Sequence, residues 1–250
     1  MKHLASLALV LVGTALSAQT IMNIHRSDGT VVEVPQNSID SITYTVLYTP
    51  GPGVTDIEGT TYPTLLYGNG QEWMAANLRA ATFANGDPIP TVVNMSEWCA
   101  LGTGAWVHYD LDAQYEDPYG RLYNWYTVED ARNVCPTDWH VPSDVEWTAL
   151  LDFLGGPLDA GGKMKMVGTP YWQLPNVGAT NESGFSAVGS SWAKGTVCTF
   201  GTLTTEALWW SSTPFSATYA WYYSLTNSSG QLNRGASDGR NGFSVRCVRD

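Results

Sequence analysis

The sequence predicts an α+β fold, in which short helices precede an antiparallel sheet. Residues 143–154 carry the clearest helix signal, because Ser143 followed by Glu146 forms a capping box ahead of an apolar stripe at helical spacing. A second helix is predicted over 122–132 from apolar residues at similar spacing. Strand patterns dominate the last third of the chain, at 208–212, 219–225 and 243–248. Helices and strands do not alternate as βαβ units, which argues against a doubly wound sheet.

The first 18 residues are typical of a cleavable secretory signal. Lys2 and His3 give a basic start, an apolar run follows over 4–16, and the small residues Ser17 and Ala18 precede polar chain. A membrane-spanning helix needs about 20 apolar residues, and this run is shorter. No later stretch is long and apolar enough to span a bilayer, so we expect no membrane insertion. The protein is expected to be secreted, or to lie in the periplasm or at the cell surface.

Three further segments are predicted after the signal. Residues 19–48 form a small β unit, since apolar residues alternate with polar ones around the turn sequence of 27–30. Residues 49–59 begin with alternating prolines and glycines, which is typical of a linker. Residues 60–250 form the main domain, because all 11 tryptophans of the chain fall between Trp73 and Trp221.

The formal net charge of the chain is −11. Phosphate binding depends on clustered lysine and arginine side chains, and an acidic surface repels nucleic acid and anionic lipid. Nucleic-acid binding is therefore excluded as a function.

Four cysteines occur in this exported chain, at Cys99, Cys135, Cys198 and Cys247. An even number in an oxidising compartment predicts two disulfides, for which three connectivities are possible. Their spacing contains no C-x-x-C pair, so a zinc ribbon or a thioredoxin-like redox site is not expected.

Several separated phrases of the main domain resemble a known family. They are YGNGQEWM at 67–74, NLR at 77–79, YGRLYNW at 119–125, CP at 135–136, WHVPSD at 139–144, EW at 146–147, WWSS at 209–212 and GFSVRCVR at 242–249. In this order they resemble the Fibrobacter succinogenes major paralogous domain, which is found on exported and surface proteins of Bacteroidetes-type bacteria. The resemblance runs from about residue 60 to residue 250 and implies no particular activity.

The resemblance does imply a fold and a disulfide pattern. The phrases at 142–147 and 242–246 are similar to those of the C-type-lectin-like superfold, which implies a bond from Cys135 to Cys247 and leaves Cys99 with Cys198. The sulfatase-modifying enzymes of that superfold need a reactive cysteine pair late in the chain. Only Cys247 lies there, so the resemblance to that enzymatic branch does not extend to its chemistry.

The segment 226–241 is the predicted binding surface. It is rich in polar side chains and poor in apolar ones, which is typical of a functional loop, although an ordinary flexible loop has the same composition. The candidate binding residues are Asn227, Asn233, Arg234, Asp238, Arg240 and Asn241, together with Trp221 on the preceding strand. We expect a non-catalytic binding module for a glycan or a surface-protein ligand, with no obligatory cofactor.

The acidic segment around Asp110 is a candidate calcium site. Asp110 and Asp112 alternate along the chain and Glu116 follows, so carboxylate oxygens that suit Ca²⁺ could gather there. The spacing departs from an EF-hand loop, and the calcium phrases of the lectin superfold are absent. A solvated acidic loop explains the same residues.

Catalysis is the alternative from a different class, as a secreted polysaccharide hydrolase. A glycosidase needs two carboxyl groups across the scissile bond, and Glu146, Asp144, Glu129 and Asp130 are the available acids. The capping box explains Glu146, and Asp144 suits the positive end of the same helix. A structural role in a surface assembly, with residues 19–48 pairing to a partner, is the third possibility.

Overall fold

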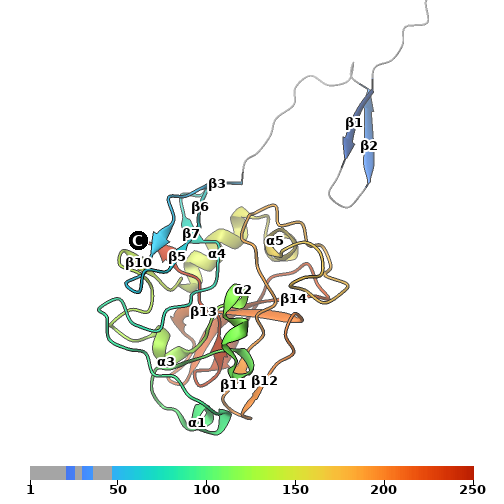
Figure 1. Cartoon of the computed structure of the whole chain (residues 1–250). Helices are drawn as coiled ribbons and strands as arrows, with labels where there is room; N and C mark the ends of the chain where they lie inside the picture. The colour runs from blue at the N-terminus through green and yellow to red at the C-terminus, as the bar shows by residue number, and fades with distance from the viewer. Residues whose placement is uncertain (1–20, 26–29, 36–46) are drawn as a thin grey trace, which may run out of the picture. The chain divides into compact units, whose positions relative to one another are not determined.

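The protein is described from a computed structural model, which describes residues 21–25, 30–35 and 47–250 (Figure 1). It consists of two compact units, residues 1–45 and residues 46–250. The predicted signal at 1–18 and most of the predicted turn at 27–30 lie outside the described residues.

The first unit contains an antiparallel hairpin. Its strands are β1 (Ile21–His25) and β2 (Val31–Pro35), and the register pairs Ile21 with Pro35 and His25 with Val31. An isolated two-stranded hairpin is marginally stable in water at best.

The second unit is a mixed α+β domain, which confirms the predicted class. The helices are short: α1 (Met95–Ala100), η2 (Tyr109–Leu111), η3 (Ala113–Tyr115), α2 (Glu116–Tyr119), α3 (Trp125–Val128), α4 (Asp144–Phe153) and α5 (Pro157–Met164). The capping box of α4 is present as predicted, with Ser143 accepting from Glu146 N and Glu146 accepting from Ser143 N.

Short antiparallel strands make up the sheets of this unit. One sheet has the order β10 (Trp139–His140), β17 (Val248–Arg249), β7 (Glu72–Met74), β6 (Thr64–Tyr67) and β3 (Tyr48–Pro50). Another has the order β12 (Thr199–Phe200), β11 (Ala193–Lys194), β16 (Gly242–Phe243), β9 (Leu122–Asn124) and β8 (Trp106–Val107). The longest strands form the third sheet, β13 (Glu206–Pro214), β14 (Tyr219–Thr226) and β15 (Asn233–Asp238).

The predicted linker at 49–59 belongs to the folded domain instead. Strand β3 pairs with β6 at the edge of its sheet, and β4 (Val54–Thr55) pairs with β5 (Thr61–Tyr62). Between them, Gly51 N donates to Thr64 O at 2.8 Å, and a Cβ at Gly51 would lie only 2.2 Å from the Thr64 hydroxyl oxygen. Proline is tolerated in edge strands and glycine permits close backbone approach, so this composition suits an edge as well as a linker.

The helix predicted over 122–132 is also corrected. Residues 122–124 form β9, and only 125–128 are helical. Asn124 separates the two, because its side chain accepts from Thr127 N while its own backbone is extended, with φ −76° and ψ 163°. An N-cap residue has non-helical dihedrals, so the helix cannot begin earlier.

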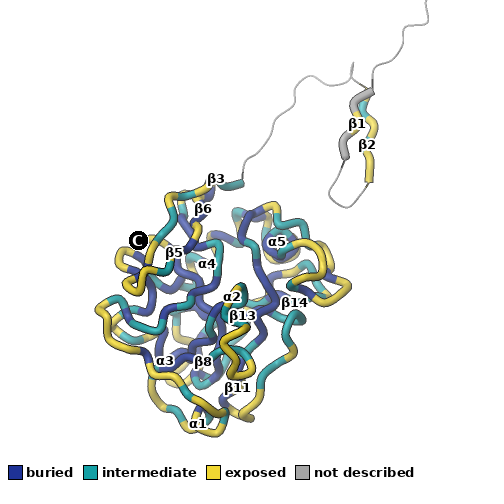
Figure 2. The backbone as a smooth tube through the Cα atoms, viewed as in Figure 1, coloured by how far each residue is buried: buried dark blue, intermediate teal, exposed yellow. Residues whose placement is uncertain are grey.

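Aromatic side chains fill the core of the second unit. Figure 2 shows the buried stretches of its backbone in dark blue. The stripe of α4 places Trp147 between Trp73 and Tyr223, with ring centroids 4.7 and 4.9 Å apart, and all three are buried. Most tryptophans are structural for this reason, as large aromatic surfaces dominate core burial.

Two disulfides lie in the second unit, in the pairing that the resemblance implies. Cys135 bonds to Cys247 in the core, and Cys99 bonds to Cys198 nearer the surface. Within the part of the chain that the structure describes, no helix combines the length and hydropathy needed to cross a bilayer.

Four of the eight recognisable phrases, at 77–79, 119–125, 209–212 and 242–249, meet at a buried polar centre. The Asn77 side-chain oxygen accepts from Trp209 Nε1 and from Arg246 Nε, both at 2.9 Å, and its amide nitrogen donates to Tyr119 O at 2.8 Å. Arg246 also donates to the carbonyls of Phe185 and Ser186. Hydrogen bonds at this centre therefore join segments that lie far apart in the sequence and stabilise the fold.

Candidate functional site

The predicted binding segment 226–241 is not a loop throughout. Residues 233–238 form β15, which pairs with β14 along its length, so this part of the prediction is corrected. The residues of this strand, NRGASD, show no apolar alternation, because β15 lies at a sheet edge and carries no large apolar face.

Most of the candidate binding side chains already have structural partners. Arg240 forms a paired contact with Asp238, at 2.9 and 2.8 Å, and Asn227 Nδ2 donates to Leu174 O at 3.1 Å. Arg234 binds both carboxylate oxygens of Asp144 and lies 3.3 Å from the centroid of Trp221. Asn233 is exposed at the start of β15.

Asn241 is the predicted residue that lies in a cleft. This aromatic cleft has a volume of about 260 Å³ and opens between the β13–β14–β15 sheet and the strands β11 and β16. It is lined by Trp192, Lys194, Glu206, Leu208, Tyr222, Ser237, Asn241 and Phe243.

The strand register explains why these side chains converge. Glu206 and Leu208 are two apart on β13, so their side chains point to the same face of the sheet. Tyr222 of β14 stands opposite Gly235 of β15, where a Cβ would lie 2.7 Å from the tyrosine hydroxyl. Glycine at that position therefore lets the Tyr222 ring lie across the neighbouring strand.

The cleft combines aromatic rings with fixed polar atoms. The Tyr222 and Phe243 rings are 5.2 Å apart, and Trp192 lies 5.4 Å from Lys194 Nζ. Asn241 is held by two hydrogen bonds, from Gly195 N at 3.0 Å and to Ser237 Oγ at 2.7 Å.

The charged side chains of the cleft, Lys194 and Glu206, do not form an ion pair with each other. Within the described residues, neither Lys194 Nζ nor the Glu206 carboxylate takes part in an ion pair. Burial raises the pKa of Tyr222, and the charge of Glu206 raises it further, so the phenol stays protonated and can donate a hydrogen bond. A small polar molecule with an apolar face fits this mixture of rings, donors and acceptors.

A family model for the Fibrobacter succinogenes major domain matches residues 67–249, which is well over half of the chain. The chain belongs to this family. No curated protein and no solved structure matches it. The matched range begins and ends at the outermost phrases of the sequence, which pair in the structure as β7 and β17.

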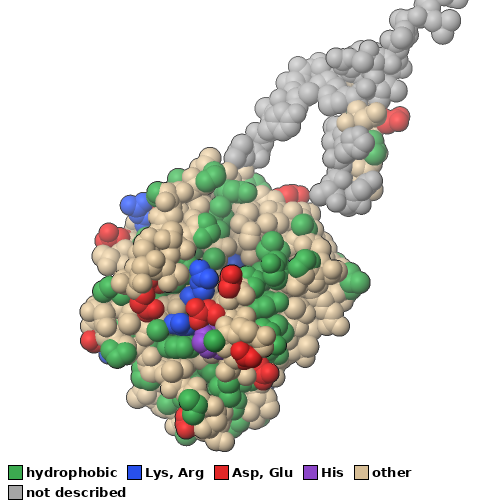
Figure 3. Space-filling view, viewed as in Figure 1, with side chains coloured by type: hydrophobic (Ala, Val, Ile, Leu, Met, Phe, Trp, Pro, Cys, Tyr) green, Lys and Arg blue, Asp and Glu red, His purple; other side chains and the backbone are tan. Residues whose placement is uncertain are grey.

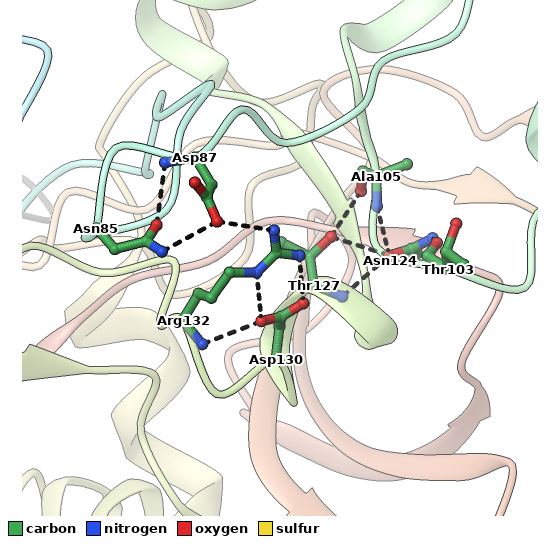
Figure 4. A network of polar contacts seen from close by, with 8 residues as sticks. All are labelled: Asn85, Asp87, Thr103, Ala105, Asn124, Thr127, Asp130 and Arg132. Atoms are coloured by element: carbon green, nitrogen blue, oxygen red, sulfur yellow. Dashed lines mark hydrogen bonds and ion pairs between the residues drawn. The ribbon is translucent and has the colours of Figure 1, made fainter.

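A second hollow of this Fibrobacter major domain lies beside the Glu129–Asp130 pair and has a volume of about 490 Å³. Figure 4 shows the Arg132 guanidinium between Asp130 and Asp87, with Asn85 bonded to Asp87 on the far side. The contacts from Arg132 lower the pKa of Asp130 to about 2, while burial and the neighbouring Asp130 raise the pKa of Glu129.

Shifts in opposite directions are the signature of paired catalytic acids. Here both oxygens of Asp130 are already bonded to Arg132, at 2.7 to 3.0 Å. These are the contacts of a bidentate arginine–carboxylate pair, in which the planar guanidinium holds both oxygens of Asp130.

The candidate calcium residues are not brought together around one point. Glu116 binds Arg121 at 2.9 Å and His108 at 2.7 Å, and Asp112 accepts from Gln114 N at 2.9 Å. Asp110 adopts a positive φ of 52° inside η2. Among the described residues, no group of three His, Cys, Asp or Glu side chains could hold a metal ion.

Most residues of the aromatic cleft were not predicted from the sequence. Trp192, Lys194 and Glu206 come from segments that are separate from the predicted 226–241 surface. The available signal was the lone Trp192 near the turn-rich stretch 194–205, since an aromatic residue outside a strand pattern has no obvious place in the core.

Proposed function

We propose that this Fibrobacter major domain is an exported, non-catalytic module that binds a carbohydrate in the aromatic cleft. The observation that carries the proposal is the convergence of Trp192, Tyr222 and Phe243 with the fixed amide of Asn241. The electron-rich face of an aromatic ring attracts the polarised C–H groups of a sugar face. The amide, hydroxyl and charged groups around it match the hydroxyls of a sugar.

The composition of the cleft supports binding rather than hydrolysis. A glycosidase needs a pair of carboxyl groups flanking the bond that breaks. Glu206 is the acid that lines the cleft, and the other lining residues include no second carboxylate. Glu129 and Asp130 line the other hollow, where the Asp130 carboxylate is bonded to Arg132.

We also propose that the domain has the C-type-lectin-like superfold and acts outside the cytoplasm. The first proposal is supported by the disulfide that joins Cys135, shortly before α4, to Cys247 beside the last strand. Two disulfides suit an oxidising compartment and support the second. A crystal structure would test the superfold, and fractionation of the source cells would test the location.

Affinity electrophoresis of the full chain through gels that contain a polysaccharide tests the proposed function. The panel contains hydroxyethyl cellulose, mixed-linkage β-glucan, glucomannan and arabinoxylan, each with calcium and with chelator. We expect at least one to retard the protein, equally in both conditions. Trp192→Ala should weaken that binding about tenfold, as expected for loss of a central aromatic contact.

Trp221→Ala is the matched control, because Trp221 is a partly buried tryptophan that does not line the cleft. It should bind as the unmodified protein does. The cleft is the wrong site if Trp221→Ala weakens binding and Trp192→Ala does not. Absence of binding to every polysaccharide, with the protein folded, would contradict carbohydrate recognition.

A further inference from the structure

A row of aromatic rings crosses the surface of the second unit outside the aromatic cleft. We define the tyrosine row as Phe200, Tyr109, Tyr115, Tyr119 and Tyr171, in that order. Successive ring centroids are 5.4, 5.2, 6.5 and 6.2 Å apart. Among the described rings, each member of the series contacts only its immediate neighbours in the series, so the rings form a row rather than a cluster.

The hydrophobic core accounts for the two ends of this row but not for its middle, since Phe200 and Tyr171 each pack against a buried cluster. Tyr109, Tyr115 and Tyr119 belong to none of the three buried clusters of the described residues. All five side chains are partly exposed. Within the described part of the chain, the hydroxyls of Tyr115, Tyr119 and Tyr171 make no hydrogen bond, whereas that of Tyr109 donates to Gly201 O at 2.8 Å. The row therefore presents ring surface and free hydroxyls to solvent.

The charges beside the row cancel one another. Figure 3 shows basic, acidic and histidine side chains gathered over α2, with hydrophobic side chains next to them. Arg121 binds Glu116 at 2.9 Å, and Arg79 lies 3.7 Å from Asp117. These cations already have carboxylate partners, and the chain as a whole carries a net charge of −11. A polyanion would find no unpaired arginine among these groups and would meet an acidic protein.

One short segment connects the row with the aromatic cleft. Gly201 N donates to Trp192 O at 3.0 Å, while Gly201 O accepts from the Tyr109 hydroxyl. Phe200 of the row pairs with Ala193, which lies between the cleft residues Trp192 and Lys194. The row thus begins next to the cleft in the structure.

We propose that the tyrosine row is a second binding surface, which takes a linear, uncharged polysaccharide along several of its sugar units. This rests on the proposed carbohydrate function and names its ligand class. Rings spaced along a line can each contact one part of a chain, and contacts that are weak one by one add up within a single ligand. A short oligosaccharide can fill the cleft but cannot engage both surfaces.

The test compares affinity for a polysaccharide with affinity for its short fragment. The probes are glucomannan, arabinoxylan and mixed-linkage β-glucan, the disaccharides made from each, and polygalacturonate as the charged comparator. The full chain and the double variant Tyr115→Ala/Tyr119→Ala are measured by isothermal titration calorimetry. Tyr115→Phe/Tyr119→Phe keeps the rings, and Tyr126→Ala removes a partly buried tyrosine outside the row.

We expect the double alanine variant to bind the neutral polysaccharide about tenfold more weakly, as for loss of aromatic contacts at an interface, and to bind the disaccharide unchanged. The phenylalanine variant and Tyr126→Ala should keep most of the affinity, and polygalacturonate should not bind. Thermal unfolding of each variant confirms that it is folded, and the single variants Tyr115→Ala and Tyr119→Ala replace a double variant that is not.

The inference is overturned if folded alanine variants bind the polysaccharide as the unmodified chain does, or if polygalacturonate binds best. In the first case Trp192→Ala would still weaken binding, so the proposed cleft would stand without the row. Failure of the unmodified chain to bind any neutral probe would instead contradict the carbohydrate function, and the proposal that the tyrosine row binds a polysaccharide would be rejected as well.

Discussion

At the scale of the residue, Asn77 is a buried side chain that holds several hydrogen-bond partners at once. Its single side-chain oxygen accepts from two donors, Trp209 Nε1 and Arg246 Nε, and all three residues are buried. A buried donor that loses its acceptor costs about 1–3 kcal/mol, and more when it is charged. Asn77, Trp209 and Arg246, which belong to three of the recognisable phrases, therefore form a site that stabilises the fold.

Replacing Asn77 with alanine should lower the free energy of unfolding by about 3 kcal/mol or more, because two donors are left without an acceptor. Urea denaturation of the full chain measures the change. Asn85→Ala is the matched control, since Asn85 is exposed and bonds only to Asp87. Equal effects of the two substitutions would show that Asn77 is not a special site.

His140 is the residue through which pH should act on stability. The hydrogen bond from its imidazole to Glu146, at 2.8 Å, raises the pKa of His140. Burial lowers this pKa and the hydrogen bond to Asp250 raises it, and the result is a pKa of about 9. The unfolded value is near 6.5. A raised pKa means that the folded state holds its proton longer, so the stabilisation is complete below about pH 6.5 and is lost as pH rises through 9.

The melting temperature should therefore fall more steeply between pH 6.5 and 9 for the unmodified chain than for His140→Gln. Differential scanning calorimetry across this range measures both proteins, and the difference between them removes the contribution of every other titrating group. Parallel curves would mean that the His140–Glu146 contact does not depend on charge.

At the scale of the element, local signals succeeded where neighbouring residues decide the structure. The capping box placed the start of α4 correctly, and strand patterns found β13 and β14 within a few residues. The single strand predicted over 243–248 was wrong, because two short strands in different sheets, β16 and β17, occupy its ends. The helix predicted over 122–132 was wrong at both ends: α3 ends at Val128, and it begins only at Trp125 because Asn124 caps it with an extended backbone. Strand β15 was missed because its edge position requires no apolar face.

Ser143→Ala should destabilise the domain by about 1 kcal/mol, as is usual when an N-cap hydroxyl is removed. The hydroxyl accepts from Glu146 N and donates to the Glu146 carboxylate, and both contacts are lost together. Chemical denaturation measures the effect, with Ser228→Ala as an exposed serine outside any helix. An unchanged midpoint would show that His140 and the packing of α4 hold the helix start without the cap.

At the scale of the whole molecule, the two disulfides close loops of similar length but in different surroundings. Their sequence separations are 112 and 99 residues, for which the chain-entropy estimate is about 4–5 kcal/mol each. Cys135 and Cys247 are buried in the core, whereas Cys198 is exposed. A reductant in solution should therefore reach the Cys99–Cys198 bond more readily than the Cys135–Cys247 bond.

Mild reduction of the native protein, followed by alkylation and mass spectrometry, should label Cys99 and Cys198 first. A thiolate must reach the disulfide to exchange with it, and the core bond is shielded. Labelling of Cys135 and Cys247 should appear only under conditions that unfold the domain. Simultaneous labelling of all four cysteines below the unfolding transition would contradict this order.

The sequence by itself determined the α+β class, the start of α4, strands β13 and β14, and the family, because these depend on residues close together in the chain or on a recognised set of phrases. The tertiary structure decided that residues 48–55 join the domain and that 233–238 form an edge strand. It also brought Trp192, Glu206, Tyr222 and Asn241 into one cleft and set the tyrosine row in line. Such convergence depends on long-range packing and strand register, and neither is encoded in the spacing of neighbouring residues.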